Sequence, residues 1–132
     1  MRELTVKPFE FSMLGEIHEW WAVAGFAKLP VELLPVNGLV VSIGDELACA
    51  GWLYRSDSAL GYLEWIVANP DVRREPRDKA LNLLISTLLA RAKGLGIKLI
   101  FSSIHHELLA MRLEKHGFIK TDRNMTNLVW RA

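Results

Sequence analysis

Residues 63–79 join an apolar strand to an Arg-rich turn and then to the start of a long helix. They read LEWIVANPDVRREPRDK, and the apolar run at their beginning is typical of a strand buried on both faces. Pro76 suits the first turn of a helix, where its missing N–H would have no partner. Apolar residues then recur at helical spacing up to Gly94. A short buried strand at residues 97–102 follows, so this order predicts a helical crossover between two parallel strands.

The rest of the chain adds antiparallel strands and two further helices. Gly44-Asp45 separates two β-rich runs and is a strong hairpin signal, because Gly tolerates a positive φ. Ser12 can cap a helix that runs to about Ala24. The other predicted elements are strands at residues 4–7, 38–43, 46–55, 60–68 and 126–130, a strand beginning at Phe118-Ile119, an irregular connection at 26–37 and a helix at 107–116. We predict one α/β (α+β) domain over residues 1–132.

The composition limits which cellular compartment and which class of partner we expect for this chain. At 132 residues, 51% hydrophobic and 23% charged, the chain can bury one core. Its net charge of +1 comes from interleaved acids and bases, which argues against a nucleic-acid partner. The single cysteine, Cys49, lies in an alternating apolar run and is interpreted as a core thiol. Glu3 and Glu10 interrupt the N-terminal residues, so neither a signal peptide nor a membrane span is predicted, and we expect a cytoplasmic protein.

Two motifs carry a resemblance to a known family. Residues 67–73 (VANPDVR) combine a strand end, a proline turn and an Arg, and residues 109–118 contain AMRLEKHGF, a helix end followed by Gly-Phe. With the link at residues 94–97, the chain resembles the GCN5-related N-acetyltransferases (GNAT) over nearly its whole length. It is also similar to small acetyltransferase-like proteins common in phage genomes. The resemblance implies a mixed central sheet flanked by helices. It also implies acetyl transfer from acetyl-CoA to the primary amine of a small molecule or a protein.

The resemblance implies a site for the cofactor phosphates at residues 73–79. The family holds the pyrophosphate on backbone N–H groups of a Gly-rich turn at a helix N-terminus, where the helix dipole favours an anion. The two family glycines fall on Pro76, which removes a donor, and on Asp78, which adds a negative charge. Four basic side chains could compensate as clamps: Arg73, Arg74, Arg77 and Lys79. The alternative is a degenerate loop, a solvated charged helix start that no longer binds CoA.

The family also separates two strands to admit the pantetheine arm. The resemblance assigns this role to the backbone of Ile66, Val67 and Ala68, with one N–H polarising the thioester carbonyl. Backbone groups depend little on side-chain identity, so this part can survive the loss of the glycines. We therefore expect a V-shaped gap between the strands at residues 60–68 and 97–102.

Proton transfer requires a base for the amine and an acid for the thiolate. Glu64 is the candidate base. It shares a strand face with Tyr62, a candidate substrate contact, and its alternative is a solvent-facing strand position. The family's acid, a Tyr on the late helix, falls on Leu113, so His106, preceded by His105, is the candidate replacement. The alternative for this pair is a polar helix cap. No third ligand accompanies the pair at metal spacing, so no metal is expected.

Trp20 and Trp21 are the other candidates for the substrate site, because the first helix forms one wall of the acceptor site in the family. Successive helical residues point about 100° apart. We therefore expect one of these two in the core and the other exposed as a pocket wall or interface residue. A competing hypothesis is a non-catalytic module on the same scaffold that recruits a protein partner through a Trp-rich surface. Pairing of two copies into a homodimer is also left open.

Overall fold

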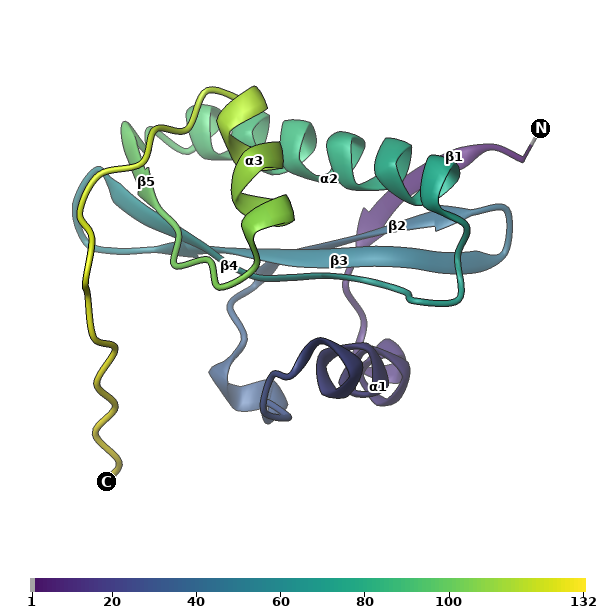
Figure 1. Cartoon of the computed structure of the whole chain (residues 1–132), viewed down its shortest axis with the longest axis horizontal. Helices are drawn as coiled ribbons and strands as arrows, with labels where there is room; N and C mark the ends of the chain where they lie inside the picture. Colours follow the sequence, from purple (N-terminus) through teal and green to yellow (C-terminus); the bar gives the residue numbers. More distant parts are fainter. Residues whose placement is uncertain (1) are drawn as a thin grey trace.

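Five strands form one mixed sheet in a computed structural model that describes residues 2–132 (Figure 1). The strands lie in the sheet in chain order, β1-β2-β3-β4-β5. Neighbours from β1 to β4 pair antiparallel, whereas β4 and β5 pair parallel. The elements are β1 (Leu4–Pro8), the 3-10 helix η1 (Phe11–Met13), α1 (Leu14–Ala24), the 3-10 helix η2 (Val31–Leu33), β2 (Asn37–Ile43), β3 (Glu46–Arg55), β4 (Leu60–Ala68), α2 (Arg74–Gly94), β5 (Leu99–Phe101) and α3 (Glu107–Lys115).

Each face of the sheet carries an apolar core. α2 and α3 cover one face, and α1 covers the other (Figure 1). Under α2, Leu84, Ile85 and Leu88 are fully buried in the core on that face. On the α1 face, the ring of Trp21 packs on that of Trp52, with centroids 5.4 Å apart. The predicted mixed sheet with flanking helices is confirmed, including the parallel crossover from β4 through α2 to β5.

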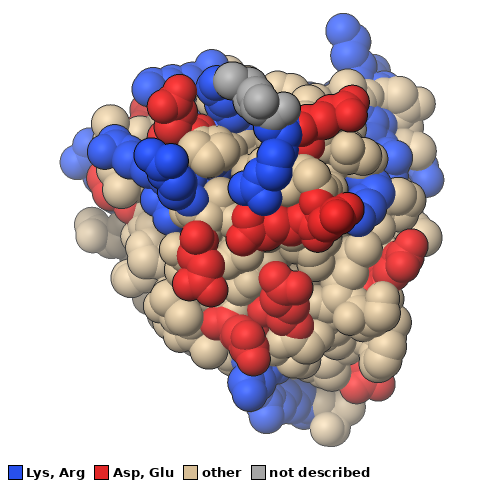
Figure 2. Space-filling view, turned by 90° about the vertical axis from the view of Figure 1, so that its right-hand side faces the viewer, with Lys and Arg blue, Asp and Glu red and all other residues tan. Residues whose placement is uncertain are grey.

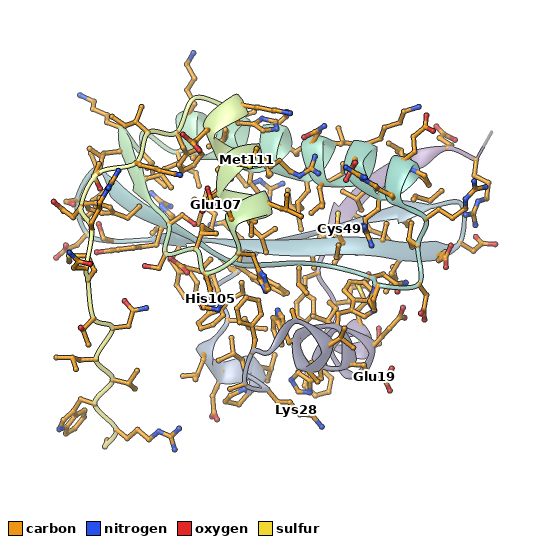
Figure 3. The ribbon with its side chains drawn as sticks, viewed as in Figure 1. Glu19, Lys28, Cys49, His105, Glu107 and Met111 are labelled. Carbon is orange, nitrogen blue, oxygen red and sulfur yellow. The ribbon has the colours of Figure 1, made fainter. Side chains whose placement is uncertain are left out.

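Cys49 lies in β3, on the side of the sheet that faces α2 (Figure 3). Its side chain is fully buried, and this burial raises the pKa of the thiol to about 12. A thiol with this pKa stays protonated at neutral pH and is a poor nucleophile. The interpretation of Cys49 as a core thiol is confirmed.

Some details of the element boundaries differ from the sequence prediction. α1 begins at Leu14 after Met13, so Ser12 lies in the preceding 3-10 turn and makes no cap. α2 begins at Arg74, so Pro76 lies in its first turn, as predicted. An N–H group at this position would have no carbonyl acceptor within the helix, so a proline is tolerated there. β5 spans Leu99–Phe101 instead of residues 97–102.

The prediction of two C-terminal strands, at Phe118-Ile119 and at residues 126–130, is wrong. Residues 118–132 contain no strand, and the chain runs away from the domain (Figure 1). The side chain of Lys120 forms ion pairs with Glu107 (3.0 Å) and Glu114 (3.8 Å), which hold the chain to α3 beyond the end of that helix. Apolar and β-branched residues form a strand only when they pair with a neighbouring strand, and no described strand pairs with residues 118–132.

Candidate active site

β4 and β5 run side by side for three residue pairs and then separate. The pairs are Leu60–Leu99, Gly61–Ile100 and Tyr62–Phe101. β4 continues to Ala68 with only β3 beside it among the described strands, while the chain after β5 turns into α3. Beyond these pairs, Ile66, Val67 and Ala68 of β4 have no described strand beside them on the β5 side, which is where the gap is expected.

The opening between the strands is narrow and is crossed by two hydrogen bonds. The hydroxyl of Ser102 donates to the carbonyl of Leu63 (2.5 Å), and the N–H of Ser103 donates to the carboxylate of Glu64 (2.9 Å). A cavity of about 40 Å³ remains, which is large enough for water but not for a cofactor arm. Its lining residues are Phe26, Glu64, Trp65, Ile66, Ser103, Ile104, His105, His106 and Leu109. The hydrogen bonds across the opening must therefore yield before a larger group can enter.

A β-bulge in β4 lies at the same opening. Trp52 pairs with Glu64 and Ala50 pairs with Val67, so two residues of β4 face Gly51 alone. Leu63 and Ile66 consequently both belong to the core under α2, although a regular strand would put them on opposite faces. Within the bulge, Trp65 has a φ of +63°, in the left-handed region that side chains rarely adopt. Such strained bulges re-aim side chains and are frequent beside functional sites.

Three hydrogen bonds hold the bulge in place. The indole N–H of Trp65 donates to the hydroxyl of Tyr54 (2.8 Å), which donates to the carbonyl of Leu33 (2.8 Å). The indole N–H of Trp21 donates to the carbonyl of Trp65 (3.2 Å). Burial raises the pKa of Tyr54, so its hydroxyl remains a donor. The strained residue is thus fixed by α1, β3 and η2 together.

Glu64 lies at the mouth of the opening and is half-buried. Burial raises the pKa of its carboxyl, and the hydrogen bond from the N–H of Ser103 lowers it in part. A carboxylate with a raised pKa accepts a proton more readily than an ordinary Glu. The half-burial of Glu64 and its hydrogen bond from Ser103 distinguish it from a freely solvent-facing strand position.

His106 lines the same cavity from the start of α3. It is the residue before the helix, but its side chain makes no cap, so the polar-cap alternative is wrong. Its Nε2 lies 3.2 Å from the carbonyl of Ala24, an acceptor, and therefore donates to it. His105 lies in the loop that joins β5 to α3 and is exposed (Figure 3). Leu113 is buried in the core, as its apolar side chain requires.

The N-terminal end of α2 forms a second, much more open hollow. Its volume is about 630 Å³, and it is lined by Arg73, Arg74, Glu75, Asp78, Lys79 and Asn82. Figure 2 shows basic and acidic side chains interleaved on the side of the molecule that includes this end of α2. The first intrahelical bond runs from the N–H of Arg77 to the carbonyl of Arg73. The N–H groups of Arg74 and Glu75 precede it and are free of intrahelical partners.

The charge of Asp78 is largely compensated within the fold. Arg112, on α3, donates to its carboxylate at 2.7 Å, and Arg74 lies 3.9 Å from it. Arg112 also donates to Asn82 (3.0 Å), so α3 is fastened to the first turns of α2. Lys79 pairs with Glu75 at 3.8 Å. The negative charge expected at residue 78 is therefore matched by a cation from a different element.

Trp20 and Trp21 do not form an exposed wall. Both side chains are buried, at 3% and 0% exposed, and pack with Ile17 against the sheet. The apolar stripe of a surface helix spans 100° or more, wide enough to hold two successive residues. The expectation that one of them is exposed is therefore wrong. Trp20 and Trp21 also do not provide the Trp-rich surface that the non-catalytic hypothesis requires. Tyr62 lies outside the cavity lining, half-exposed and stacked on Phe101.

Several residues of this site went unnoticed in the sequence. Four of them take part in the site because of the register shift in β4, and neither composition nor spacing signals such a shift. They are Tyr54, Trp65, Ser102 and Ser103. Arg112 lies in the AMRLEKHGF motif, but its partner is 34 positions away in the chain. The sequence signal for Arg112 is Asp78 itself, because an acid in a phosphate turn requires a cation to compensate its charge.

Chains of known structure share this architecture at low sequence identity. A Trypanosoma brucei acetyltransferase aligns with a TM-score of 0.72 at 16% identity, covering 96% of this chain and 100% of that one. The fold is the GNAT acetyltransferase fold. Rv2747 from Mycobacterium tuberculosis, in complex with CoA and NLQ, aligns with a TM-score of 0.75 at 18% identity, covering 89% and 73%. A Bacillus halodurans transcriptional regulator aligns with a TM-score of 0.67 at 16% identity, covering 98% and 100%.

At these identities the GNAT likeness establishes the fold alone. No protein-family model and no curated protein sequence matches the chain. Within residues 2–132, no group of three or more His, Cys, Asp or Glu side chains is placed to hold a metal ion. None of the helices in that range has the length and apolar character needed to cross a bilayer.

Proposed function

We propose that the chain is an acyl-CoA-dependent N-acyltransferase that transfers acetyl from acetyl-CoA to a primary amine of a small molecule or a protein. The observation that carries this proposal is the separation of β4 from β5 beside a strained bulge, with half-buried Glu64 at the opening. Acyl-CoA chemistry and a protonated core thiol suit the cytoplasm. The acetyltransferase fold supports the reaction class, although a fold alone does not determine activity.

The residues of the two hollows fit the parts of acyl-CoA. At the start of α2, Arg73, Arg74, Arg77 and Lys79 would hold phosphates, assisted by the N–H groups of Arg74 and Glu75. The pairing of Asp78 with Arg112 removes most of the repulsion that its charge would otherwise cause. Between the strands, the backbone groups of Ile66, Val67 and Ala68 would align the thioester. Pro76 leaves one phosphate donor missing, so we expect weaker phosphate binding than a Gly-rich turn provides.

Glu64 would act as the base, directly or through a water molecule. An ammonium has no free electron pair, so a proton must leave it before the amine nitrogen can attack the thioester carbon. The carboxylate accepts that proton. The C–N bond forms, the nitrogen loses its second proton to become an amide, the C–S bond breaks, and the departing thiolate must take up a proton.

His106 is the candidate donor of that last proton. It lies in the same cavity as Glu64, and its bond to the carbonyl of Ala24 fixes the orientation of its ring. His105 is the adjacent alternative, with its ring centroid 5.6 Å from that of His106. Replacing each in turn by Asn, and measuring turnover as a function of pH, distinguishes the two.

A thermal-shift titration tests the proposal. A ligand that binds only the native state, at a hundredfold over its Kd, adds about 2.7 kcal/mol of stability. We expect acetyl-CoA to raise the melting temperature of both the wild type and Glu64→Gln, and acetylation of a panel of primary amines to require Glu64. The absence of a shift with saturating acetyl-CoA would overturn the proposal. ATP, which has phosphates but no pantetheine, serves as the control ligand and should produce a smaller shift.

A further inference from the structure

Two aromatic rings meet at nearly a right angle in the cavity that Glu64 lines. Phe26, in the loop after α1, and Trp65, in the β4 bulge, have ring centroids 6.4 Å apart and planes 87° apart. Phe26 also meets the ring of His106 edge-on, with centroids 6.2 Å apart. All four side chains line the same cavity. We call the rings of Phe26 and Trp65, together with the carboxylate of Glu64, the aromatic corner.

Both rings of the aromatic corner are held in place. Gly25 ends α1 with a φ of +87°, and the N–H of Phe26 donates to the carbonyl of Trp21 (2.8 Å). This helix cap fixes the point at which Phe26 leaves α1. The indole N–H of Trp65 donates to the hydroxyl of Tyr54 (2.8 Å). Rings that are already in position bind a ligand with little loss of side-chain entropy.

The cavity lining contains one acid and no permanent cation. Glu64 is its acid, and none of the described residues that line it is Lys or Arg. Its two imidazoles, His105 and His106, are not permanent cations, and the Nε2 of His106 bonds to the carbonyl of Ala24. Lys28, in the loop after α1, is exposed and projects away from the sheet (Figure 3). A carboxylate entering this cavity would meet Glu64 and the negative ring faces without a fixed cation to pair with.

We infer that the acceptor is an alkyl amine with no carboxylate on the carbon that bears the nitrogen, and that the aromatic corner selects it. This inference rests on the proposed function. An ammonium head is compact enough for the cavity of about 40 Å³, and it is attracted both to the ring faces and to the carboxylate of Glu64. An α-amino acid brings its own carboxylate to the same place. The repulsion of that second charge contributes to the selection as much as the attraction does.

Acetylation of matched amines tests the selection. Phenethylamine and phenylalanine differ only in the carboxylate, and phenylalaninol replaces that group by a neutral one. We expect kcat/KM for phenethylamine and for phenylalaninol to exceed that for phenylalanine by about 100-fold, because like charges brought together cost several kcal/mol. Phenylalanine acetylated as fast as phenethylamine would overturn this inference and leave the proposed function intact.

Substitutions at Phe26 test the corner itself. Phe26→Leu keeps an apolar side chain but removes the ring, so the KM for phenethylamine should rise by about 3-fold to 10-fold. Phe26→Arg places a cation in the corner and should shift the preference toward phenylalanine. Phe11→Leu is the matched control, because Phe11 is 68% exposed and lies outside the cavity lining, and its KM should equal that of the wild type. A wild-type KM in Phe26→Leu, or a wild-type preference in Phe26→Arg, would remove the corner from amine recognition.

Calorimetric titration with these amines, with and without CoA, separates this inference from the proposed function. Phenethylamine should bind the wild type more tightly than it binds Phe26→Leu, and more tightly than phenylalanine binds either. Binding of this pattern in a chain that acetylates no amine would support the inference and overturn the proposed function. The absence of amine binding in every condition would overturn the inference.

Discussion

The two hollows that together would hold acyl-CoA are built in opposite ways. The opening at Glu64 is small, partly buried and fixed by hydrogen bonds from α1, β3, η2 and the loop after β5. The hollow at the start of α2 is wide, exposed and lined by charges that pair mostly with each other at 3.8–3.9 Å. Exposed pairs of this kind contribute little to stability. The groups at the first hollow are therefore held in a fixed arrangement, whereas the charged side chains at the second hollow are only weakly held in place.

This difference predicts which substitutions matter. Changes at the Glu64 opening should affect turnover strongly, and those that break the hydrogen bonds of the Trp65 bulge should also lower stability, because each group there has a specific partner. Changes at the α2 turn should affect cofactor affinity gradually, because several cations share one task.

Replacing Glu64 by Gln should have the largest effect. General-base catalysis contributes about 100-fold to 10,000-fold, so turnover should fall by at least about 100-fold. The wild-type rate should rise with pH through the raised pKa of Glu64 and then level off, and Glu64→Gln should lose this acidic limb. Turnover within a few-fold of the wild type would remove Glu64 from the mechanism.

The same variant should not lose stability. The pKa of Glu64 is higher in the folded state than in the unfolded chain, so the folded state binds its proton more tightly. Stability from this group is present at low pH and is lost as pH rises through the folded-state pKa. At neutral pH the uncharged Gln should melt at the same temperature or higher. A marked decrease would show that the ionised carboxylate is needed for folding.

Replacing Arg73 and Arg74 together by Ala should have the next largest effect. We expect the affinity for acetyl-CoA to fall by about tenfold, equivalent to about 1.4 kcal/mol, with turnover at saturation nearly unchanged. Titration calorimetry at two salt concentrations measures this, and the wild-type affinity should depend more steeply on salt. Arg91→Ala, at the exposed far end of α2, is the control. Equal affinities for the double variant and the control would remove the α2 turn from the site.

Tyr54→Phe and Trp65→Phe should each cost at least about 1 kcal/mol of unfolding free energy, because each breaks the hydrogen bond between the two side chains. Tyr54→Phe also removes the bond to the carbonyl of Leu33, and Trp65→Phe also removes packed ring volume. The double variant should cost less than the sum, since both substitutions remove the same bond. Urea denaturation measures all three. Tyr62→Phe is the control, because this half-exposed ring lies outside the network, and should change stability little. Strictly additive losses would mean that the bond does not hold the bulge.

Pro76→Ala should have the smallest effect and the opposite sign for binding. It restores an N–H in the first turn of α2, so we expect acetyl-CoA to bind a few-fold more tightly. The unfolded chain gains freedom when a proline is lost, so stability should fall by up to about 1 kcal/mol. Pro70→Ala, in the turn before the helix, should share the stability loss without the gain in affinity. Unchanged or weaker binding by Pro76→Ala would show that backbone N–H groups do not contact the phosphates.

The sequence predicts the periodic parts of the molecule and fails where tertiary contacts decide. The hairpin at Gly44-Asp45 and the crossover through α2 follow from local patterns, and both are present. The bulge at Trp65 depends on which residue of β3 faces which residue of β4, and no local pattern encodes that. The sequence makes Trp21 a candidate for the substrate site, but its side chain packs on the sheet. The strand expected at residues 126–130 has a suitable composition but pairs with no described strand.

Amide hydrogen exchange with and without acetyl-CoA is the most direct test of the opening between β4 and β5 as the acyl-CoA slot. We expect slower exchange in peptides covering residues 64–68 when acetyl-CoA is bound, because their backbone groups gain partners at the strand edge. Peptides covering β1, at the opposite edge of the sheet, should exchange at the same rate in both conditions. Binding that leaves residues 64–68 unchanged and protects another surface would contradict the assignment of this opening as the acyl-CoA slot.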